Sequence, residues 1–312
     1  MQTVVLDKVP ALGALYAQAA LGATRRVRRV APGSLPDVSA EAREVRISEE
    51  SLIQYQRLLG DAVREEVPSV FLHGTVFPVA LWLLARKDFP LPLLGMVHLS
   101  NHVRHLRPVR PSETLTLRAH ARDLRVHRAG TQVDLISQVL VGEELVWEGR
   151  SVYLAKGVSL EGSSRPEAEP HPDFVPPATT GRWRLDATTG RRFAEVLGDF
   201  NPIHLSLVSA KLLGLKRPIA HGMYLAARAL KSAAPHGVGY AWEIEFAVPV
   251  QLPGSVEFAL TSATQSSVGP GTSDEEPGSV GFVGWDARKV RPHFAGSVVP
   301  LALAATVGAG TD

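Results

Sequence analysis

Two groups of segments alternate apolar and polar residues, and this pattern predicts antiparallel β-strands joined by short turns. In the first group the turns fall at Gly130 and Gly142. A helical pattern that contains a His-Gly pair precedes each group, so the order of helix and then strands occurs twice. This order predicts an α+β architecture with one antiparallel sheet in each half of the chain. The strands are expected at 114–122, 132–141 and 144–154 in the first half, and at 242–248, 256–264, 278–286 and 290–299 in the second.

Three short sequences recur in the same order in both halves, which indicates an internal repeat. Between the halves lies a stretch rich in proline and serine, which is typical of a linker. We therefore expect an N-terminal helix and a degenerate first half at 1–157, a linker at 158–180, and a catalytic second half at 181–312. The recurring pairs are Leu59-Gly60-Asp61 with Leu197-Gly198-Asp199, His73-Gly74 with His221-Gly222, and Pro108-Val109 with Pro249-Val250.

The segment 9–24 is mostly apolar and predicts a short helix that packs on the body of the protein. Tyr16 and Gln18 interrupt the apolar run. A signal peptide carries its positive charges before the apolar run, whereas here they follow it, and no window approaches about 18 uninterrupted apolar residues. We expect no signal peptide and no transmembrane helix. The charges that follow the run, interpreted as a solvated face, are Arg25, Arg26, Arg28 and Arg29.

The composition narrows the class of protein. A chain of 312 residues with 45% hydrophobic and 21% charged residues is typical of a globular protein with two domains. A net charge of +2 falls short of a nucleic-acid-binding surface. The absence of cysteine excludes disulfides, thiolate nucleophiles and cysteine metal sites, and is compatible with a cytoplasmic location. Much arginine and alanine with little lysine is typical of a bacterium with a GC-rich genome.

Residues 198–204 read Gly-Asp-Phe-Asn-Pro-Ile-His, which brings a carboxylate and an imidazole close together in the sequence. A proline restricts the residue before it to extended or turn geometry, so Asn201-Pro202 predicts a fixed bend. Such a bend can aim Asp199 and His204 at one water molecule, and an Asp and a His can divide the work of a general acid and a general base. Asn201 is expected to brace the bend by bonding nearby backbone groups.

After a short helical stretch, residues 217–223 read Arg-Pro-Ile-Ala-His-Gly-Met. Together with the 198–204 motif, they resemble the signature of the MaoC-like, (R)-specific enoyl thioester hydratase family, and the length of the chain resembles its double hot-dog members. The resemblance implies two antiparallel sheets, each wrapped round a central helix. It also implies hydration of trans-2-enoyl thioesters, or the reverse dehydration of 3-hydroxyacyl thioesters, on coenzyme A or acyl carrier protein.

The resemblance also implies roles for particular residues. Asp199 and His204 would both contact the catalytic water, and which of them takes its proton stays open. The backbone N–H of Gly222 would hold the thioester oxyanion, for which a helix N-terminus is suited. Asn201 and Pro202 would support the turn, and His221 is interpreted as a structural histidine at the helix entrance. No cofactor is expected beyond the coenzyme A or phosphopantetheine that the substrate carries.

The first half departs from this pattern. Residues 62–66, which follow Leu59-Gly60-Asp61, contain neither Asn-Pro nor a histidine. The distance from the aspartate to the glycine of the His-Gly pair is 13 positions (61 to 74), against 23 in the second half (199 to 222). We expect an inactive half that lacks the helix overhanging the site. It would complete the sheet and leave a wider tunnel for a long or bulky acyl chain.

Other polar residues allow several interpretations. His98, His102 and His105 would share one face of a helix and could bind zinc, whereas on a strand they would not come together, and we expect no metal site. The segment 262–279 is interpreted as a long hairpin loop. Basic residues that could contact phosphates, or be solvated charges, are Arg104, Arg107, Arg110, Lys211, Lys216 and Arg217.

Two other functions compete with the hydratase hypothesis. A hot-dog thioesterase also needs a carboxylate, a water and an oxyanion donor, and fold alone does not separate the two activities. A non-catalytic acyl-binding subunit would keep the motif only as a turn. No Gly-x-Ser-x-Gly elbow is present, which excludes the common serine hydrolases. The two halves can pair within one chain, and further pairing into a homodimer stays open.

Overall fold

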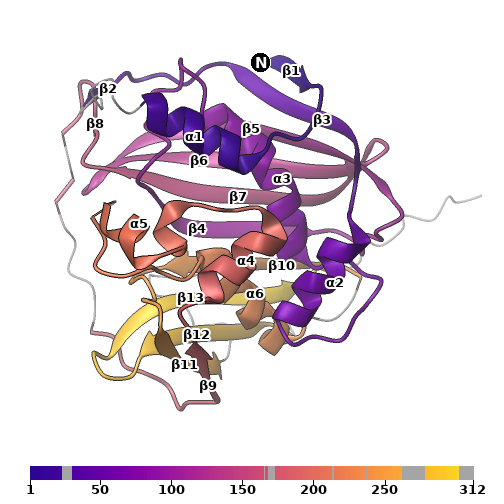
Figure 1. The fold of residues 1–312 in the computed structure, drawn as a ribbon, viewed down its shortest axis with the longest axis vertical. Helices are drawn as coiled ribbons and strands as arrows, with labels where there is room; N and C mark the ends of the chain where they lie inside the picture. The colour runs from indigo at the N-terminus through magenta and orange to yellow at the C-terminus, as the bar shows by residue number, and fades with distance from the viewer. Residues whose placement is uncertain are drawn as a thin grey trace, which may run out of the picture.

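Figure 1 shows the computed structural model of the chain. It describes residues 1–22, 30–164, 166–167, 173–212, 214–235, 238–261 and 278–301. The arginines that follow the N-terminal helix and nearly all of the predicted loop at 262–279 lie outside the described residues.

The first half folds into a sheet with the strand order β1-β3-β5-β6-β7-β4. Neighbouring strands are antiparallel except for β1 and β3, which run parallel. The predicted meander is confirmed, and it extends by several residues at the ends of its strands. The bounds are β1 Gln2–Leu6, β3 Val38–Arg46, β4 Met96–His105, β5 Thr114–His127, β6 Gly130–Val141 and β7 Glu144–Lys156.

The second half continues in the order β10-β13-β12-β11-β9, and all its strand pairs are antiparallel. Each of the strands predicted here is present among the described residues. The strands are β9 Gly181–Leu185, β10 Tyr240–Phe246, β11 Gly254–Thr261, β12 Val280–Asp286 and β13 Arg291–Pro300.

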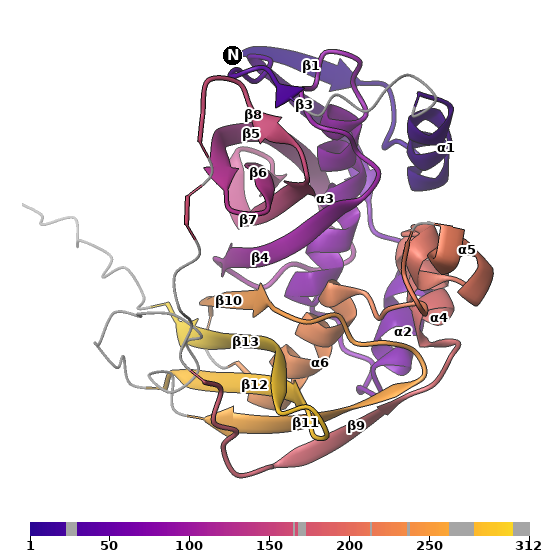
Figure 2. The same cartoon turned by 90° about the vertical axis from the view of Figure 1, so that its left-hand side faces the viewer.

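Antiparallel pairing of β4 with β10 joins the two halves into one 11-stranded sheet. Figure 2 shows that the sheet curls around two helices, α3 (Ser69–Leu84) and α6 (Gly222–Ala233). The predicted fold, with two antiparallel sheets that each wrap a central helix, is therefore confirmed. Within the stretch predicted as a linker, β8 (Ser159–Leu160) pairs in parallel with β2 (Val30–Ala31).

The α3 helix is apolar on nearly all its sides, which is typical of a helix surrounded by protein. The smaller helices form an outer layer on the side of α3 and α6 away from the sheet (Figure 2). Helices α2 and α4 pack against each other. The outer elements are α1 Leu12–Gly22, α2 Glu49–Leu58, α4 Thr189–Leu197, the 3-10 helix η1 Pro202–His204 and α5 Leu207–Leu212.

The ends of the central helices correct one detail of the repeat. The N-cap of α6 is His221 and that of α3 is Pro68. The residues before these caps make the same bond, from Ala220 N–H to the Val250 carbonyl and from Val67 N–H to the Val109 carbonyl, each 2.8 Å. The structural counterpart of His221-Gly222 is therefore Pro68-Ser69. The match with His73-Gly74 is wrong, because that pair lies about one turn inside α3.

Candidate active site

The 198–204 turn follows directly from its sequence. Helix α4 ends at Leu197, and its C-cap Gly198 has φ 76°, a left-handed conformation that glycine adopts without strain. The side-chain oxygen of Asn201 then accepts a hydrogen bond from Ile203 N–H at 3.4 Å and caps η1, with Pro202 as its first residue. Asp199 and His204 therefore lie on one turn, which is formed by the end of α4 and by η1.

The turn brings Asp199 and His204 together with His221. One side-chain nitrogen or oxygen from each of the three lies within 4.8 Å of those of the other two. The rings of His204 and His221 stack with centroids 3.6 Å apart and planes inclined by 28°. His221 Nε2 lies 3.0 Å from the backbone oxygen of Asp199 and 3.8 Å from its Oδ2.

Carbonyl partners fix the proton on each ring, because a carbonyl oxygen only accepts hydrogen bonds. His204 Nδ1 lies 2.8 Å from the Ile219 carbonyl and must donate to it, which leaves Nε2 with a lone pair. His221 Nε2 likewise donates to the Asp199 carbonyl. In its neutral form His204 can therefore accept a proton at Nε2, while His221 holds the backbone of Asp199 in place.

Burial keeps both imidazoles neutral at physiological pH. It lowers the pKa of His204 to about 3, with the neighbouring His221 as a second cause. Burial also lowers the pKa of His221 to about 4. The pKa of Asp199 is raised by burial, and the nearby His204, a hydrogen bond from Tyr16 and one from the Asn201 backbone oppose this rise.

Gly222 is the first residue of α6, so its N–H has no acceptor within the helix. A Cβ at this position would lie 2.8 Å from Cζ of Phe246, so the site admits only glycine without rearrangement. A small ligand atom can approach the N–H where a side chain would block it. The geometry suits a carbonyl oxygen that gains negative charge.

Two residues at the site are not evident from the sequence motif. The Tyr16 hydroxyl of α1 donates to Asp199 Oδ1 at 2.9 Å, and the only signal in the sequence is a tyrosine within an apolar run. Gly190, in the first turn of α4, lies so close to the carbonyl oxygen of His204 that a Cβ would overlap it. This glycine carries no local motif, so the contact is visible only in the fold.

A family model for the MaoC like domain matches residues 165–274, which include Asp199, His204 and Gly222. The 3-hydroxyacyl-thioester dehydratase X of Mycobacterium tuberculosis is 34% identical over 240 residues, which are 76% of this chain and 84% of that protein. The chain belongs to the MaoC-like dehydratase family. It is therefore a hydratase or dehydratase of the MaoC type, as the motif predicts.

Solved structures agree with this assignment. The crystal structure of HtdX from Mycobacterium tuberculosis matches 84% of the chain and all of its own length, with a TM-score of 0.70 and 27% identity. A MaoC-like dehydratase from Phytophthora capsici matches 88% of the chain and 98% of its own length, with a TM-score of 0.66 and 17% identity, and supports the fold alone.

The first half of this MaoC-like enzyme also contributes to the wall of the site. Burial raises the pKa of Tyr153 in β7, and the nearby charge of Asp199 raises it further. The Tyr153 ring stacks on His98 of β4 at 4.6 Å between ring centroids. His98 in turn contacts Phe246, the ring that lies against Gly222. The candidate site is thus built by both halves. The first half therefore contributes side chains next to the site as well as strands to the sheet, and the wider tunnel stays a prediction.

The first half lacks a second copy of the site within its described residues. Asp61 follows Gly60, which has φ 64°, but its carboxylate accepts only from the Ala62 N–H, at 3.0 Å. The chain then reaches Ser69 in 8 positions (61 to 69), where the second half takes 23, so nothing corresponds to α5. The Ser69 hydroxyl, at the place of Gly222, accepts from the indole N–H groups of Trp147 and Trp242, each at 2.8 Å.

The three spaced histidines lie on strand β4 and do not form a cluster. His98 packs among aromatic rings, His102 pairs with Glu243, and His105 bonds the Tyr240 hydroxyl. Among the described residues, the group close enough to hold a metal is Asp199, His204 and His221. Imidazole lone pairs lie in the ring planes, and two rings stacked this closely share no point in both planes at bonding distance. That no metal binds at this site therefore stays a prediction.

The basic residues considered as phosphate contacts have different surroundings. Arg107 pairs with Glu113 and Glu144, which makes it a structural residue at the end of β4. Lys211, Lys216 and Arg217 are exposed on and after α5.

No described helix is long and apolar enough to cross a membrane.

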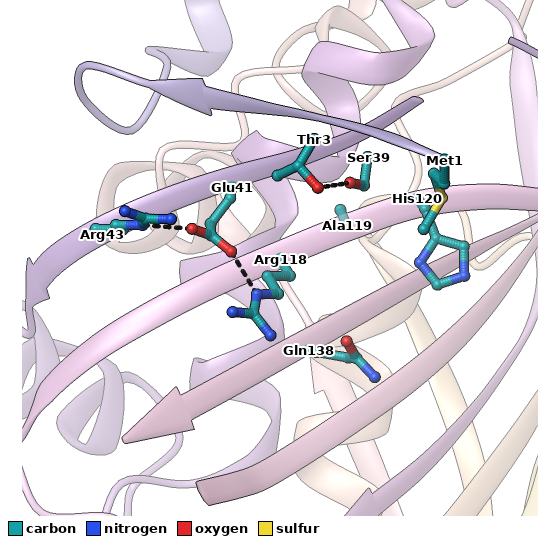
Figure 3. Close-up of a pocket in the computed structure, with 9 residues that line it drawn as sticks. All are labelled: Met1, Thr3, Ser39, Glu41, Arg43, Arg118, Ala119, His120 and Gln138. Carbon is teal, nitrogen blue, oxygen red and sulfur yellow. Dashed lines mark hydrogen bonds and ion pairs between the residues drawn. The ribbon is translucent and has the colours of Figure 1, made fainter. Parts of the chain in front are cut away.

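A cavity of about 440 Å³ lies on different elements, between β1, β3, β5 and β6 (Figure 3). Its central carboxylate, Glu41, is held by Arg43 and Arg118, so both its oxygens are already paired. Burial lowers the pKa of His120 at the same cavity. The cavity thus lacks an unpaired carboxylate beside its histidine, which the Asp199 site has.

Proposed function

We propose that this protein is an (R)-specific hydratase and dehydratase that interconverts trans-2-enoyl and 3-hydroxyacyl thioesters. The name of the mycobacterial relative, 3-hydroxyacyl-thioester dehydratase X, supports this substrate class. Coenzyme A or the phosphopantetheine of an acyl carrier protein would arrive as part of the substrate. The observation that carries the proposal is the ionisable Asp199 carboxylate beside the free Nε2 of His204, with the Gly222 N–H at the start of α6.

The two side chains can hold one water molecule, because both the carboxylate and His204 Nε2 accept hydrogen bonds and water donates two. In hydration, the water oxygen bonds to C3 of the enoyl group and one of its protons passes to the pair. The electrons of the double bond move toward the thioester oxygen, which the Gly222 N–H holds. The proton then passes from the pair to C2, and dehydration follows the same steps in reverse.

The charge of the pair favours this cycle. An ionised Asp199 and a neutral His204 carry one negative charge, and the pair becomes neutral when it takes the proton of the water. A buried charge is unfavourable, so the proton transfer relieves part of the burial cost. The same proton can return to the substrate carbon, so no third acid is required.

The test is the loss of enoyl absorbance when crotonyl-CoA and a longer trans-2-enoyl-CoA are mixed with the wild-type protein. Asp199→Asn and His204→Ala should each lower the rate by about 10²- to 10⁴-fold while the protein stays folded, because each removes a positioned acid or base. Asp61→Asn is the matched control. Asp61 holds the same place in the repeat, but its carboxylate bonds the adjacent Ala62 N–H. The rate of the Asp61→Asn variant should therefore equal that of the wild type.

Other outcomes would contradict the proposal. Unchanged absorbance with release of free thiol would identify a thioesterase. No reaction with coenzyme A or carrier-protein thioesters would favour a non-catalytic acyl-binding subunit. An Asp61→Asn variant as inactive as Asp199→Asn would show that both halves catalyse.

A further inference from the structure

The N-terminal helix provides a buried polar contact to the candidate acid/base pair. Tyr16 of α1 is 8% exposed, and its hydroxyl lies 2.9 Å from Asp199 Oδ1, 183 positions away in the sequence. An ionised carboxylate cannot donate, so the phenol is the donor. The catalytic turn in the second half is thus hydrogen-bonded to helix α1 of the first half.

We propose that Tyr16 is a positioning residue for Asp199: it holds Oδ1, so that Oδ2 stays free for the catalytic water. This inference rests on the proposed hydratase function. It concerns residue 16, which lies outside the stretch that matches the family model.

The division of the two carboxylate oxygens carries the first part of the argument. Oδ1 is taken by the Tyr16 hydroxyl. Oδ2 lies on the histidine side, 3.8 Å from His221 Nε2, which already donates to the Asp199 backbone at 3.0 Å. Oδ2 is therefore the oxygen available to a water between Asp199 and His204. Without the phenol, the carboxylate could rotate and present either oxygen.

Asn201 of the motif acts on the same phenol. It accepts from Ile203 N–H through Oδ1, so its amide nitrogen is free to donate. Burial raises the pKa of Tyr16, and the Asn201 side chain opposes that rise, as a donor to the phenol oxygen would. A donor on that side leaves the Tyr16 proton for Asp199.

Packing alone does not require the hydroxyl. Leu12 and Leu15 are buried on the same side of α1 as Tyr16. Leu12 lies 3.9 Å from the position that a Cβ would take at Gly198, beside the catalytic turn. A phenylalanine at position 16 would keep the ring in this apolar contact and remove only the donor. The role of the hydroxyl can therefore be tested apart from the docking of the helix.

Electrostatics gives the contact a measurable signature. Burial raises the pKa of Tyr16 far above its usual value, and the charge of Asp199 raises it further, so the phenol stays protonated and always donates. Its bond opposes the rise that burial imposes on the pKa of Asp199. The ionisable groups that act on Asp199 are Tyr16 of α1, Tyr153 of β7, His204 of η1 and His221 at the start of α6.

The experiment measures kcat, KM and the pH profile of kcat/KM for Tyr16→Phe. We expect kcat to fall by about 10- to 100-fold, as for the loss of a hydrogen bond to a charged group, with KM little changed. The acidic limb of the profile should move to higher pH. Tyr240→Phe is the matched control, because it removes the hydroxyl of a half-buried tyrosine that bonds His105 away from the site, and it should leave kcat and the acidic limb unchanged.

A second variant and a direct titration separate the inference from the proposed function. 3,5-Difluorotyrosine at position 16 keeps the shape and strengthens the donor, so it should move the acidic limb to lower pH. A carbon-13 titration of Asp199, assigned with Asp199→Asn, reports the same shift without any substrate. If Tyr16→Phe keeps the wild-type kcat, acidic limb and Asp199 titration, the inference is overturned even when Asp199→Asn is inactive. If the titration shifts but the wild type converts no thioester, the proposed function fails and the contact stands.

Discussion

At the scale of single residues, the site depends on close backbone contacts as much as on its acid and base. Gly190 lets the carbonyl of His204 lie directly against the first turn of α4, and Gly222 leaves room for the ring of Phe246. Both glycines have ordinary backbone angles, so they are required for space and not for conformation. The positions of His204 and of the Gly222 N–H, the proposed oxyanion donor, thus depend on the missing side chains of Gly190 and Gly222.

We predict that Gly190→Ala lowers kcat by roughly 10²-fold, because the new methyl group displaces the His204 backbone and misplaces a reacting group. Alanine is the better helix former, so the loss would not come from helix propensity. Steady-state kinetics with circular dichroism as a check of folding measures this. Gly181→Ala is the control, since nothing lies within 4 Å of its Cβ position. Wild-type rates in a folded Gly190→Ala variant would show that the turn adapts.

The residues that could be predicted are those whose constraints are local. Asp199, Asn201, Pro202 and His204 fall within one turn, and the proline alone fixes much of its geometry. Tyr16 could not be predicted, because its partner is 183 positions away and a tyrosine in an apolar run is common in cores. His221 was expected to be structural, and it holds the Asp199 backbone at 3.0 Å.

At the scale of elements, Ser69 at the start of α3 links the two halves. Its hydroxyl accepts from Trp147 of β7 and from Trp242 of β10, and all three residues are buried. One hydroxyl oxygen thus satisfies two indole donors from different halves. The same position in the second half is Gly222, which has no side chain and has the Phe246 ring packed against it.

We predict that Ser69→Ala destabilises the protein by about 2 to 6 kcal/mol, since it leaves two buried N–H donors without an acceptor at about 1 to 3 kcal/mol each. Urea unfolding followed by tryptophan fluorescence measures the change. Ser232→Ala, which removes an exposed hydroxyl bonded to the Arg228 carbonyl, should alter stability little. A Ser69→Ala loss no greater than that of the control would mean that other acceptors replace the serine.

Elements with a regular pattern were predicted to within a few residues, and irregular ones were not. The strands β5, β6 and β7 alternate over part of their length and are separated by turns at Gly130 and Gly142, although their pairing also has register shifts. Strand β4 has such a shift between His98 and Ser100, and its partial alternation left helix and strand both open. The edge strand β1 pairs in parallel with β3 across 36 positions, which no local pattern reveals. The repeat fixed the order of elements but not which His-Gly pair begins a helix.

At the scale of the molecule, histidines are kept neutral by burial in both halves. Their pKa values are lowered to about 4 for His73, His105 and His221 and to about 3 for His98 and His204. In the unfolded chain a histidine titrates near pH 6.5. Below that pH the unfolded state binds more protons than the folded state, so the free energy of unfolding must fall as the pH falls.

We predict that the urea midpoint decreases steadily between pH 6.5 and 5, a window above the usual range of carboxylates. Each such histidine contributes a slope of at most about 1.4 kcal/mol per pH unit, and Asp199, whose pKa burial raises, works in the opposite direction. Unfolding titrations at several pH values give the slope, and His73→Leu should flatten it by removing one of these groups. A stability that does not change across this window would contradict the prediction.

The two hot-dog halves belong to one polypeptide, and they pair through β4 and β10. In a symmetric homodimer every substitution appears in both copies, so a change that fills one site fills the other. In this single chain the two halves have different sequences, so a substitution in one half leaves the other half unchanged. Ser69 could become an internal acceptor for two tryptophans while Gly222 stayed bare, and helix α1 could add Tyr16 to one site without a counterpart at the other.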